Sequence, residues 1–317
     1  MTTAPEMLKR RIAEGLVAFP ATPFTQDGEL DVGGLEEHIA TLAAHRPSLL
    51  VPAGGAGELF SLSAAEHETI CRIAVAEKTG IPVMAGVGFG VAMATEMART
   101  AERAGADAIL LFSPYLITPD QEGLAAYVAA VCRAVGIGVV AYSRNNGVLA
   151  ADTALRLADA CPNFIAVKDG TGDFEGLVSL KQRAGDRLTL INGVPTAEII
   201  APQCFAIGIR SYSSAVFSFL PEFALAYFRA VRDGDEGTVN RMLAEFYVPL
   251  TAIRNRKRGY AVALVKAGLG AVGQPAGPVR PPLVDFSPAD ARDLALLIER
   301  ARALTAGAPA ALAAKAR

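Results

Sequence analysis

A lysine ends a short apolar run in the middle of the chain, Phe164-Ile165-Ala166-Val167-Lys168. A run of this length predicts a strand buried on both faces, with the lysine at its C-terminal end. If the amine lies in a desolvated pocket, the ammonium form is disfavoured, the pKa falls, and Lys168 becomes a nucleophile for carbonyl carbons. The alternative is a lysine whose stem packs on apolar surface while its ammonium reaches water. By itself the run favours that alternative, because most lysines are exposed.

Tyr142 and Arg144 follow another apolar run, residues 138–141. A tyrosine hydroxyl can carry a proton, and a guanidinium can bind a carboxylate through two parallel hydrogen bonds. Each residue also has a structural interpretation, as a packed tyrosine and as a surface arginine paired with an acidic neighbour. The two residues become informative only if the fold brings them to Lys168.

A glycine-rich loop, residues 54–57 (Gly-Gly-Ala-Gly), precedes a helix that begins with a capping box. The backbone N–H groups of Gly55 and Ala56 could hold an anion, or the loop could be a tight turn that needs positive φ, and both interpretations stay open. Two later segments are candidates for binding a polar substrate. Asn192 ends the run 188–191, and Ser211 lies in the hydroxyl-rich loop 210–214, which could alternatively cap a helix.

Eight apolar runs alternate with helical patterns over roughly the first 220 residues. We expect strands at 16–20, 49–52, 81–86, 108–112, 138–142, 164–168, 188–191 and 206–209. Repeated strand–helix units of this kind predict an α/β fold, a (β/α)8 TIM barrel, rather than an open sheet. We assign residues 1–232 to the barrel and residues 233–317, where only helical patterns occur, to a C-terminal helical appendage.

In such a barrel the active site lies at the C-terminal ends of the strands. That rule places the candidate residues around one mouth: Lys168, Tyr142, Gly55, Ala56, Arg144, Asn192 and Ser211. The strand before Lys168 ends at Tyr142, so we expect their side chains to be neighbours. Lys168 is then better interpreted as a catalytic nucleophile than as a solvated lysine.

Composition and motifs exclude several classes of function. A net charge of −2 and a pI of about 6.0 give no electrostatic footprint for nucleic acid. No apolar stretch reaches the roughly 20 residues of a membrane span, and no signal peptide is recognisable, so we expect a cytoplasmic protein. The four cysteines include no Cys-x-x-Cys pair and the three histidines have no metal-binding spacing, so we expect reduced thiols and no metal. Residues 86–90 depart from the dinucleotide fingerprint, which argues against NAD.

With these residues placed, nearly the whole chain resembles the dihydrodipicolinate synthase / N-acetylneuraminate lyase family of class I, Schiff-base barrels. Residues 54–58 are similar to the family's Gly-Thr-Thr-Gly-Glu loop, Tyr142 to its catalytic tyrosine and Lys168 to its Schiff-base lysine. Two positions differ. Gly55 and Ala56 replace hydroxyl residues, so a carboxylate there must rely on backbone N–H groups. Leu116 stands where the synthases have a second tyrosine, which argues against the synthase's own reaction.

Within the family, four runs resemble the members that act on 5-dehydro-4-deoxy-D-glucarate: residues 193–198, 211–217, 265–268 and 277–283. The resemblance implies that Lys168 forms a Schiff base with this keto-deoxy sugar diacid, which then loses water and CO2 to give 2,5-dioxopentanoate. Tyr142 or water would mediate proton removal, and Arg144, Asn192 and Ser211 would bind the distal hydroxyl and carboxylate. No cofactor is implied, and the implied assembly is a homo-oligomer, a dimer of dimers.

Two other activities remain open at this level. One is a related aldolase that cleaves or condenses pyruvate at the same lysine, using a 2-keto-3-deoxy sugar acid. The other is a non-catalytic family member that binds a keto-acid and regulates. The residues alone do not separate the dehydratase from the aldolase.

Overall fold

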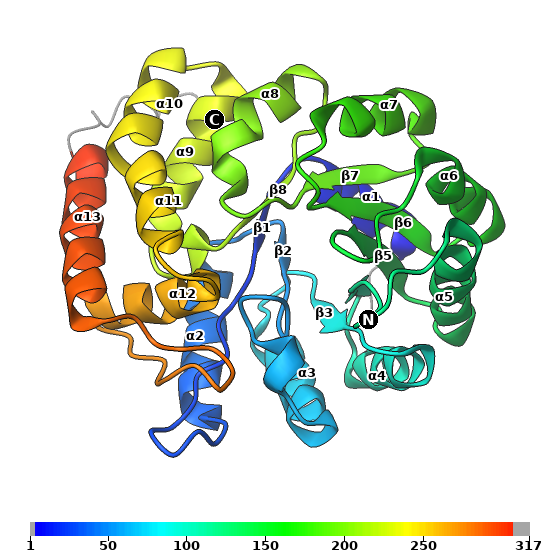
Figure 1. Cartoon of the computed structure of the whole chain (residues 1–317), viewed down its shortest axis with the longest axis horizontal. Helices are drawn as coiled ribbons and strands as arrows, with labels where there is room; N and C mark the ends of the chain where they lie inside the picture. Colours follow the sequence, from blue (N-terminus) through cyan, green and yellow to red (C-terminus); the bar gives the residue numbers. More distant parts are fainter. Residues whose placement is uncertain (1–3, 307–317) are drawn as a thin grey trace.

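A computed structural model of the chain describes residues 4–306, and its centre is a sheet of eight parallel strands (Figure 1). The strand order is β2-β1-β8-β7-β6-β5-β4-β3, and a parallel bridge between Leu50 and Val83 joins its two ends. The predicted (β/α)8 barrel is therefore confirmed. The strands are β1 (Leu16–Ala18), β2 (Leu49–Leu50), β3 (Met84–Val87), β4 (Ala108–Leu111), β5 (Gly138–Ser143), β6 (Phe164–Asp169), β7 (Thr189–Asn192) and β8 (Tyr212–Ser214).

Helices follow the strands and form an outer ring, which Figure 1 shows around the sheet. None of those within residues 4–306 is long and apolar enough to cross a membrane. The helices of the ring are α2 (Val32–Ala44), α3 (Ala64–Glu77), α4 (Val91–Ala104), α5 (Gln121–Ala134), α6 (Ala151–Ala160), α7 (Phe174–Ala184), α8 (Ala201–Ala206) and α9 (Pro221–Asp233), with short 3-10 turns η1 (Leu59–Ser61), η2 (Ala197–Ile200) and η3 (Val216–Ser218).

Two hydrophobic layers hold the barrel together. Inward-facing side chains such as Val17, Met84 and Leu110 fill its interior, and a larger outer core lies between the strands and the helices. Because both faces of each strand are buried, the strands have the continuous apolar sequences that made them recognisable. The polar exceptions at the strand ends, above all Lys168, are therefore the residues that need a functional explanation.

The N-terminal end of the barrel is closed by α1 (Pro5–Ala13), a helix that the sequence analysis did not assign. Its buried Leu8 and Ile12 belong to the same cluster as the inward-facing barrel residues, and it packs against β6 and β7. This end is therefore filled with apolar side chains, which leaves the opposite end for binding and chemistry.

The eighth strand lies later in the sequence than we expected. Residues 206–209 end helix α8 and form a turn through Gly208, whereas β8 begins at Tyr212. A short apolar run does not by itself distinguish a strand from the buried end of a helix, and here it belonged to the helix. The consequence for the site is that Ser211 precedes β8 instead of following it.

After the barrel the described chain is helical: α10 (Glu236–Met242), η4 (Leu243–Tyr247), α11 (Val248–Arg254), α12 (Tyr260–Ala271) and α13 (Pro288–Ala306). These helices gather on one side of the ring, beside α9 (Figure 1). The single helix expected over 235–254 is interrupted by the π-helical turn η4, just before Pro249, because proline cannot donate the backbone bond of a regular helix. A domain boundary at residue 232 stays a prediction, and residues 307–317 lie outside the described part.

Candidate active site

Lys168 lies near the end of β6, directly beside Tyr142 on β5 in the strand register. Its side chain is buried, with 4% of its surface exposed. The amine Nζ lies 3.6 Å from the centroid of the Tyr142 ring and 5.0 Å from that of Phe19. Burial lowers the pKa of Lys168, although the neighbouring Tyr142 opposes the shift. The expectation that the fold would bring Tyr142 to the lysine is confirmed.

The Tyr142 hydroxyl has polar partners on two sides. It donates a hydrogen bond to the carbonyl of Gly193 (2.9 Å) and accepts one from Arg144 Nη1 (2.9 Å). Burial by itself would raise the pKa of this phenol, but the positive charges of Lys168 and Arg144 outweigh burial and lower the pKa below its ordinary value. A phenol with a lowered pKa, in contact with a lysine amine, is suited to carrying protons.

The carbonyl of Gly193 is shared by both residues, because Lys168 Nζ also donates to it (3.4 Å). Residue 193 has to be glycine. A Cβ atom there would lie 2.5 Å from Lys168 Cγ and 2.9 Å from the carbonyl oxygen of Asp169. The loop after β7 therefore packs directly on the lysine stem and fixes the direction of the amine.

A cavity of about 280 Å³ opens above the lysine at the C-terminal end of the barrel. The walls come from the loops after β1, β2, β4, β5, β7 and β8 and from the start of α12. Besides Lys168 and Tyr142, the lining residues are Phe19, Gly55, Ala56, Phe60, Phe112, Arg144, Gly193, Val194, Pro195, Thr196, Ser213, Ala215, Ala261 and Val262.

The glycine-rich loop presents unused backbone donors to this cavity. Within residues 4–306, the N–H groups of Gly55 and Ala56 meet no hydrogen-bond acceptor, while both residues line the cavity. The loop is held from behind, because the Thr22 hydroxyl donates to the carbonyl of Gly57 (2.7 Å). Two free amides in the same cavity as a buried amine have the chemistry to bind a carboxylate.

Comparison with known proteins identifies the family of the chain. A family model described as the dihydrodipicolinate synthetase family matches residues 12–301. The chain belongs to that family. A relative from Saccharopolyspora erythraea, named a probable 5-dehydro-4-deoxyglucarate dehydratase, is 50% identical over 93% of this chain and 96% of its own length. A relative of the same name from Rhizobium rhizogenes is 45% identical over 94% of this chain and 99% of its own.

Solved structures of the family show the same fold. The dihydrodipicolinate synthase of Oceanobacillus iheyensis superposes with a TM-score of 0.86, covering 94% of this chain and 99% of that one, at 23% identity. At that identity the likeness concerns the fold alone. Among residues 4–306, no three His, Cys, Asp or Glu side chains gather as a metal site, and all four cysteines are buried and unpaired.

Two residues expected at the mouth do not line the cavity. Ser211, which lies before β8, donates its hydroxyl to the carbonyl of Gly15, the residue before β1, and is fully buried. Placing Ser211 in the mouth was wrong, because the eighth strand had been placed too early in the sequence. The Asn192 amide is also turned inward and donates to the carbonyl of Ala197 (2.9 Å), so it positions the loop after β7.

Ser213 and Thr196 line the cavity instead, and the sequence analysis did not propose them as site residues. Thr196 has φ 54°, a left-handed conformation that is unusual for a β-branched residue. Its place in the run 193–198 was the available signal, since that run carried part of the family resemblance. Side-chain direction could not be read from the run.

Glu58, the residue that follows the glycine-rich loop, forms a buried ion pair with Lys266 of α12 (2.9 Å). Lys266 also donates to the carbonyl of Pro278, and the backbone N–H of Arg280 donates to Glu58 (3.0 Å). Removing either charge would leave the other buried and unpaired, which is strongly destabilising. The runs 265–268 and 277–283 therefore hold the glycine-rich loop in place and do not enter the cavity.

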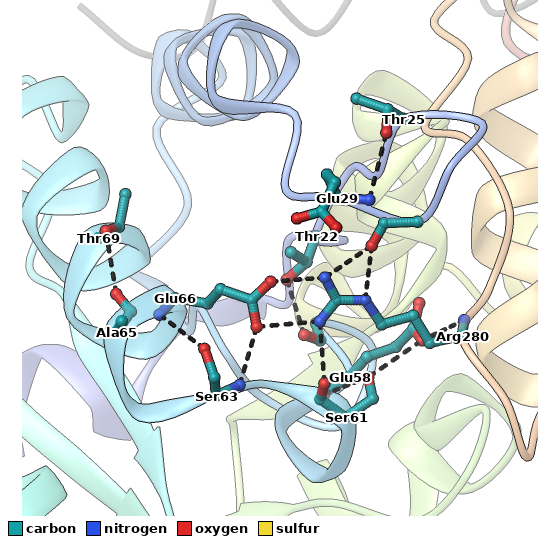
Figure 2. A network of polar contacts seen from close by, with 12 residues as sticks. Thr22, Thr25, Glu29, Glu58, Ser61, Ser63, Ala65, Glu66, Thr69 and Arg280 are labelled. Carbon is teal, nitrogen blue, oxygen red and sulfur yellow. Dashed lines mark hydrogen bonds and ion pairs between the residues drawn. The ribbon is translucent and has the colours of Figure 1, made fainter.

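Arg280 extends this contact to the helix that follows the loop (Figure 2). Its guanidinium donates to both carboxylate oxygens of Glu66 (3.0 and 2.5 Å) and to the carbonyls of Gly28 and Ser61. Glu66 at the same time completes the capping box with Ser63. Together these bonds join the C-terminal segment to the start of α3.

The Arg280–Glu66 contact predicts how stability depends on pH. The hydrogen bonds from Arg280 lower the pKa of Glu66 from 4.5 to about 2. A carboxyl with a lowered pKa in the folded state stabilises the fold above its unfolded pKa, and this contribution is lost as pH falls. We expect the free energy of unfolding to decrease between about pH 4.5 and about pH 2, and to decrease less in Glu66→Gln. Urea denaturation across that range measures both slopes.

A matched control is Glu68→Gln, an exposed glutamate on the same helix. Its unfolding should follow the wild-type pH dependence. If Glu66→Gln and Glu68→Gln lost stability in parallel with the wild type as the pH fell, the Arg280–Glu66 bonds would not be the source of the effect.

Proposed function

We propose that this protein is a 5-dehydro-4-deoxyglucarate dehydratase, a lyase that converts 5-dehydro-4-deoxy-D-glucarate to 2,5-dioxopentanoate, water and CO2. The observation that carries the proposal is the buried amine of Lys168 against Tyr142, in a chain up to 50% identical to relatives named for this activity. A desolvated lysine at the mouth of a barrel is an electron sink in its own right, so the reaction needs no metal or organic cofactor.

In the proposed reaction, the Lys168 amine attacks the ketone carbon and expels its oxygen as water, which gives an iminium ion. The iminium acidifies the adjacent methylene, and Tyr142 or a water molecule carries its proton away. The resulting enamine expels the neighbouring hydroxyl as water. Loss of CO2 from the distal carboxylate then sends its bonding electrons into the conjugated iminium. Protonation and hydrolysis release the product and the free lysine, so the net loss is one water and one CO2.

The charge distribution of the cavity supports a diacid substrate. The free N–H groups of Gly55 and Ala56 are the groups that we assign to the carboxylate beside the ketone. Arg144 donates to the Tyr142 hydroxyl and lines the same cavity, so its guanidinium can attract the second carboxylate. Phe19, Phe60 and Phe112 in the walls limit the access of water to the reacting atoms.

The test is turnover of 5-dehydro-4-deoxy-D-glucarate by the purified protein. We expect CO2 and 2,5-dioxopentanoate in equal amounts, without added metal or nucleotide. Release of pyruvate without CO2 would instead identify an aldolase. Absence of turnover on this diacid and on related keto-deoxy sugar acids would identify a non-catalytic keto-acid-binding protein.

The loop between β4 and α5 supports assembly into a homo-oligomer. Tyr115, Leu116 and Ile117 have 73%, 79% and 62% of their surfaces exposed, and contiguous apolar side chains on a surface mark an interface. We propose that a second copy of the chain covers them and that two such dimers associate. Leu116→Asp should lower the mass measured by light scattering, and an unchanged mass would refute this interface.

The four unpaired, buried thiols support a reducing compartment, the cytoplasm.

A further inference from the structure

Arg254, at the end of α11, reaches the rim of the cavity from the C-terminal segment. Its Nη1 donates to the hydroxyl of Thr196, which lines the cavity after β7. Its Nε donates to the side chain of Asn255 (3.1 Å). Thr196, whose left-handed backbone is strained, is thus held at the rim by an arginine from a distant part of the chain.

Arg254 is close enough to Arg144 for their charges to interact. Burial lowers the pKa of Arg254, the charge of Glu198 opposes that shift, and the charge of Arg144 adds to it. Neither guanidinium has a carboxylate within ion-pair distance among residues 4–306, although both are half-buried. Two like charges placed together without a counterion cost free energy, and an anion bound between them would reverse that cost.

The carboxyl groups nearby offset the charge of these arginines only in part, Glu198 through its interaction with Arg254. Glu198 is fully buried behind the rim and accepts a hydrogen bond from Ser214 (2.6 Å), and burial raises its pKa to about 7. Asp169 is buried and accepts a hydrogen bond from Thr171 (2.9 Å), and burial raises its pKa as well. Because Arg144 lines the cavity together with Lys168, the two arginines leave its mouth with an excess of positive charge.

We propose that Arg254 is a specificity-determining residue, and that with Arg144 and the Thr196 hydroxyl it binds the distal carboxylate of the substrate. The guanidinium fork matches a carboxylate through two charge-assisted hydrogen bonds, which a neutral hydroxymethyl group at the same place cannot replace. Arg254 therefore selects keto-acids with a second carboxylate over monoacids. Because it takes the substrate to be a diacid, this role rests on the proposed function.

Two keto-acids of equal carbon number separate this role from the chemistry at Lys168. They are 2-oxoadipate, which has a second carboxylate, and 2-oxohexanoate, which does not. Each is trapped on the full-length protein with borohydride, and mass spectrometry of the Lys168 peptide gives the half-saturating concentration. We expect the wild type to prefer 2-oxoadipate by about tenfold or more, which corresponds to about 1.4 kcal/mol. Arg254→Gln should remove most of that preference, by raising the half-saturating concentration of 2-oxoadipate much more than that of 2-oxohexanoate.

Arg258→Gln is the matched control, because Arg258 is an exposed arginine in the turn after α11 and its loss changes the net charge equally. It should keep the wild-type preference. An unchanged preference in Arg254→Gln, or an equal loss for both keto-acids, would overturn the role of Arg254 and leave the Schiff base intact. Absence of a Lys168 adduct with either acid in the wild type would overturn the Schiff-base function and this role with it.

Discussion

Replacing Lys168 with alanine is expected to lower kcat/KM by at least about 1,000-fold, because no other cavity-lining residue within 4–306 carries an amine that can form the iminium. Borohydride added with substrate should reduce an adduct on the wild-type protein and none on Lys168→Ala. The measurement is the mass of the intact protein and of its lysine-containing peptides. Because burial lowers the pKa of Lys168, its neutral amine is available at a lower pH than that of an ordinary lysine. As pH rises, the yield of the trapped adduct should therefore reach its maximum at a lower pH than for an ordinary lysine.

Two other lysines are the natural competitors, and the structure separates them from the cavity. Lys266 is held in the buried ion pair with Glu58, and Lys181 lies in α7 near residues of α1, at the closed end of the barrel. Lys181→Ala should therefore trap substrate as the wild type does. An adduct that formed equally well on Lys168→Ala would refute the mechanism outright.

Tyr142→Phe is the second large effect that we expect, with kcat lower by about 10² to 10⁴, the range for losing a proton carrier. The ring would remain against the lysine amine, and only the hydroxyl between Arg144 and Gly193 would be lost. Schiff-base formation should be slowed much less than the later proton transfers. Trapping with substrate should thus still mark Lys168 while the release of CO2 nearly stops.

Tyr127→Phe is the matched control for this substitution. Tyr127 is also a buried tyrosine, and its hydroxyl donates to the carbonyls of Phe89 and Phe112 without lining the cavity. Its loss should cost stability, about 1 kcal/mol for a hydrogen bond, and leave kcat near the wild-type value. Equal effects of the two substitutions on kcat would show that the Tyr142 hydroxyl only supports the fold.

The C-terminal segment has two separate tasks at the active site. Lys266 and Arg280 brace the glycine-rich loop from behind, which keeps the Gly55 and Ala56 amides in place. At residue 277, a Cβ atom would lie 1.8 Å from the carbonyl oxygen of Phe24, so glycine lets the two segments approach. Arg254 contacts the rim of the cavity at Thr196.

The sequence by itself determined the barrel and the positions of Lys168 and Tyr142 at the ends of adjacent strands. These are consequences of local patterns, since apolar runs and helix signals repeat with a period that neighbouring residues reveal. It also located the glycine-rich loop. The sequence placed residues at the mouth correctly where they lie at the end of a well-defined strand.

Only the tertiary structure decided which side chains face the cavity. Ser211 and Asn192 turned away from it because their direction depends on where β8 begins and on the fold of the loop after β7. Arg254 and the Glu58–Lys266 pair join segments that are far apart in sequence, and no local pattern encodes such contacts. These contacts depend on long-range packing. The same packing brings Arg144 and Arg254 to the mouth of the cavity that contains Lys168, the lysine predicted from the sequence.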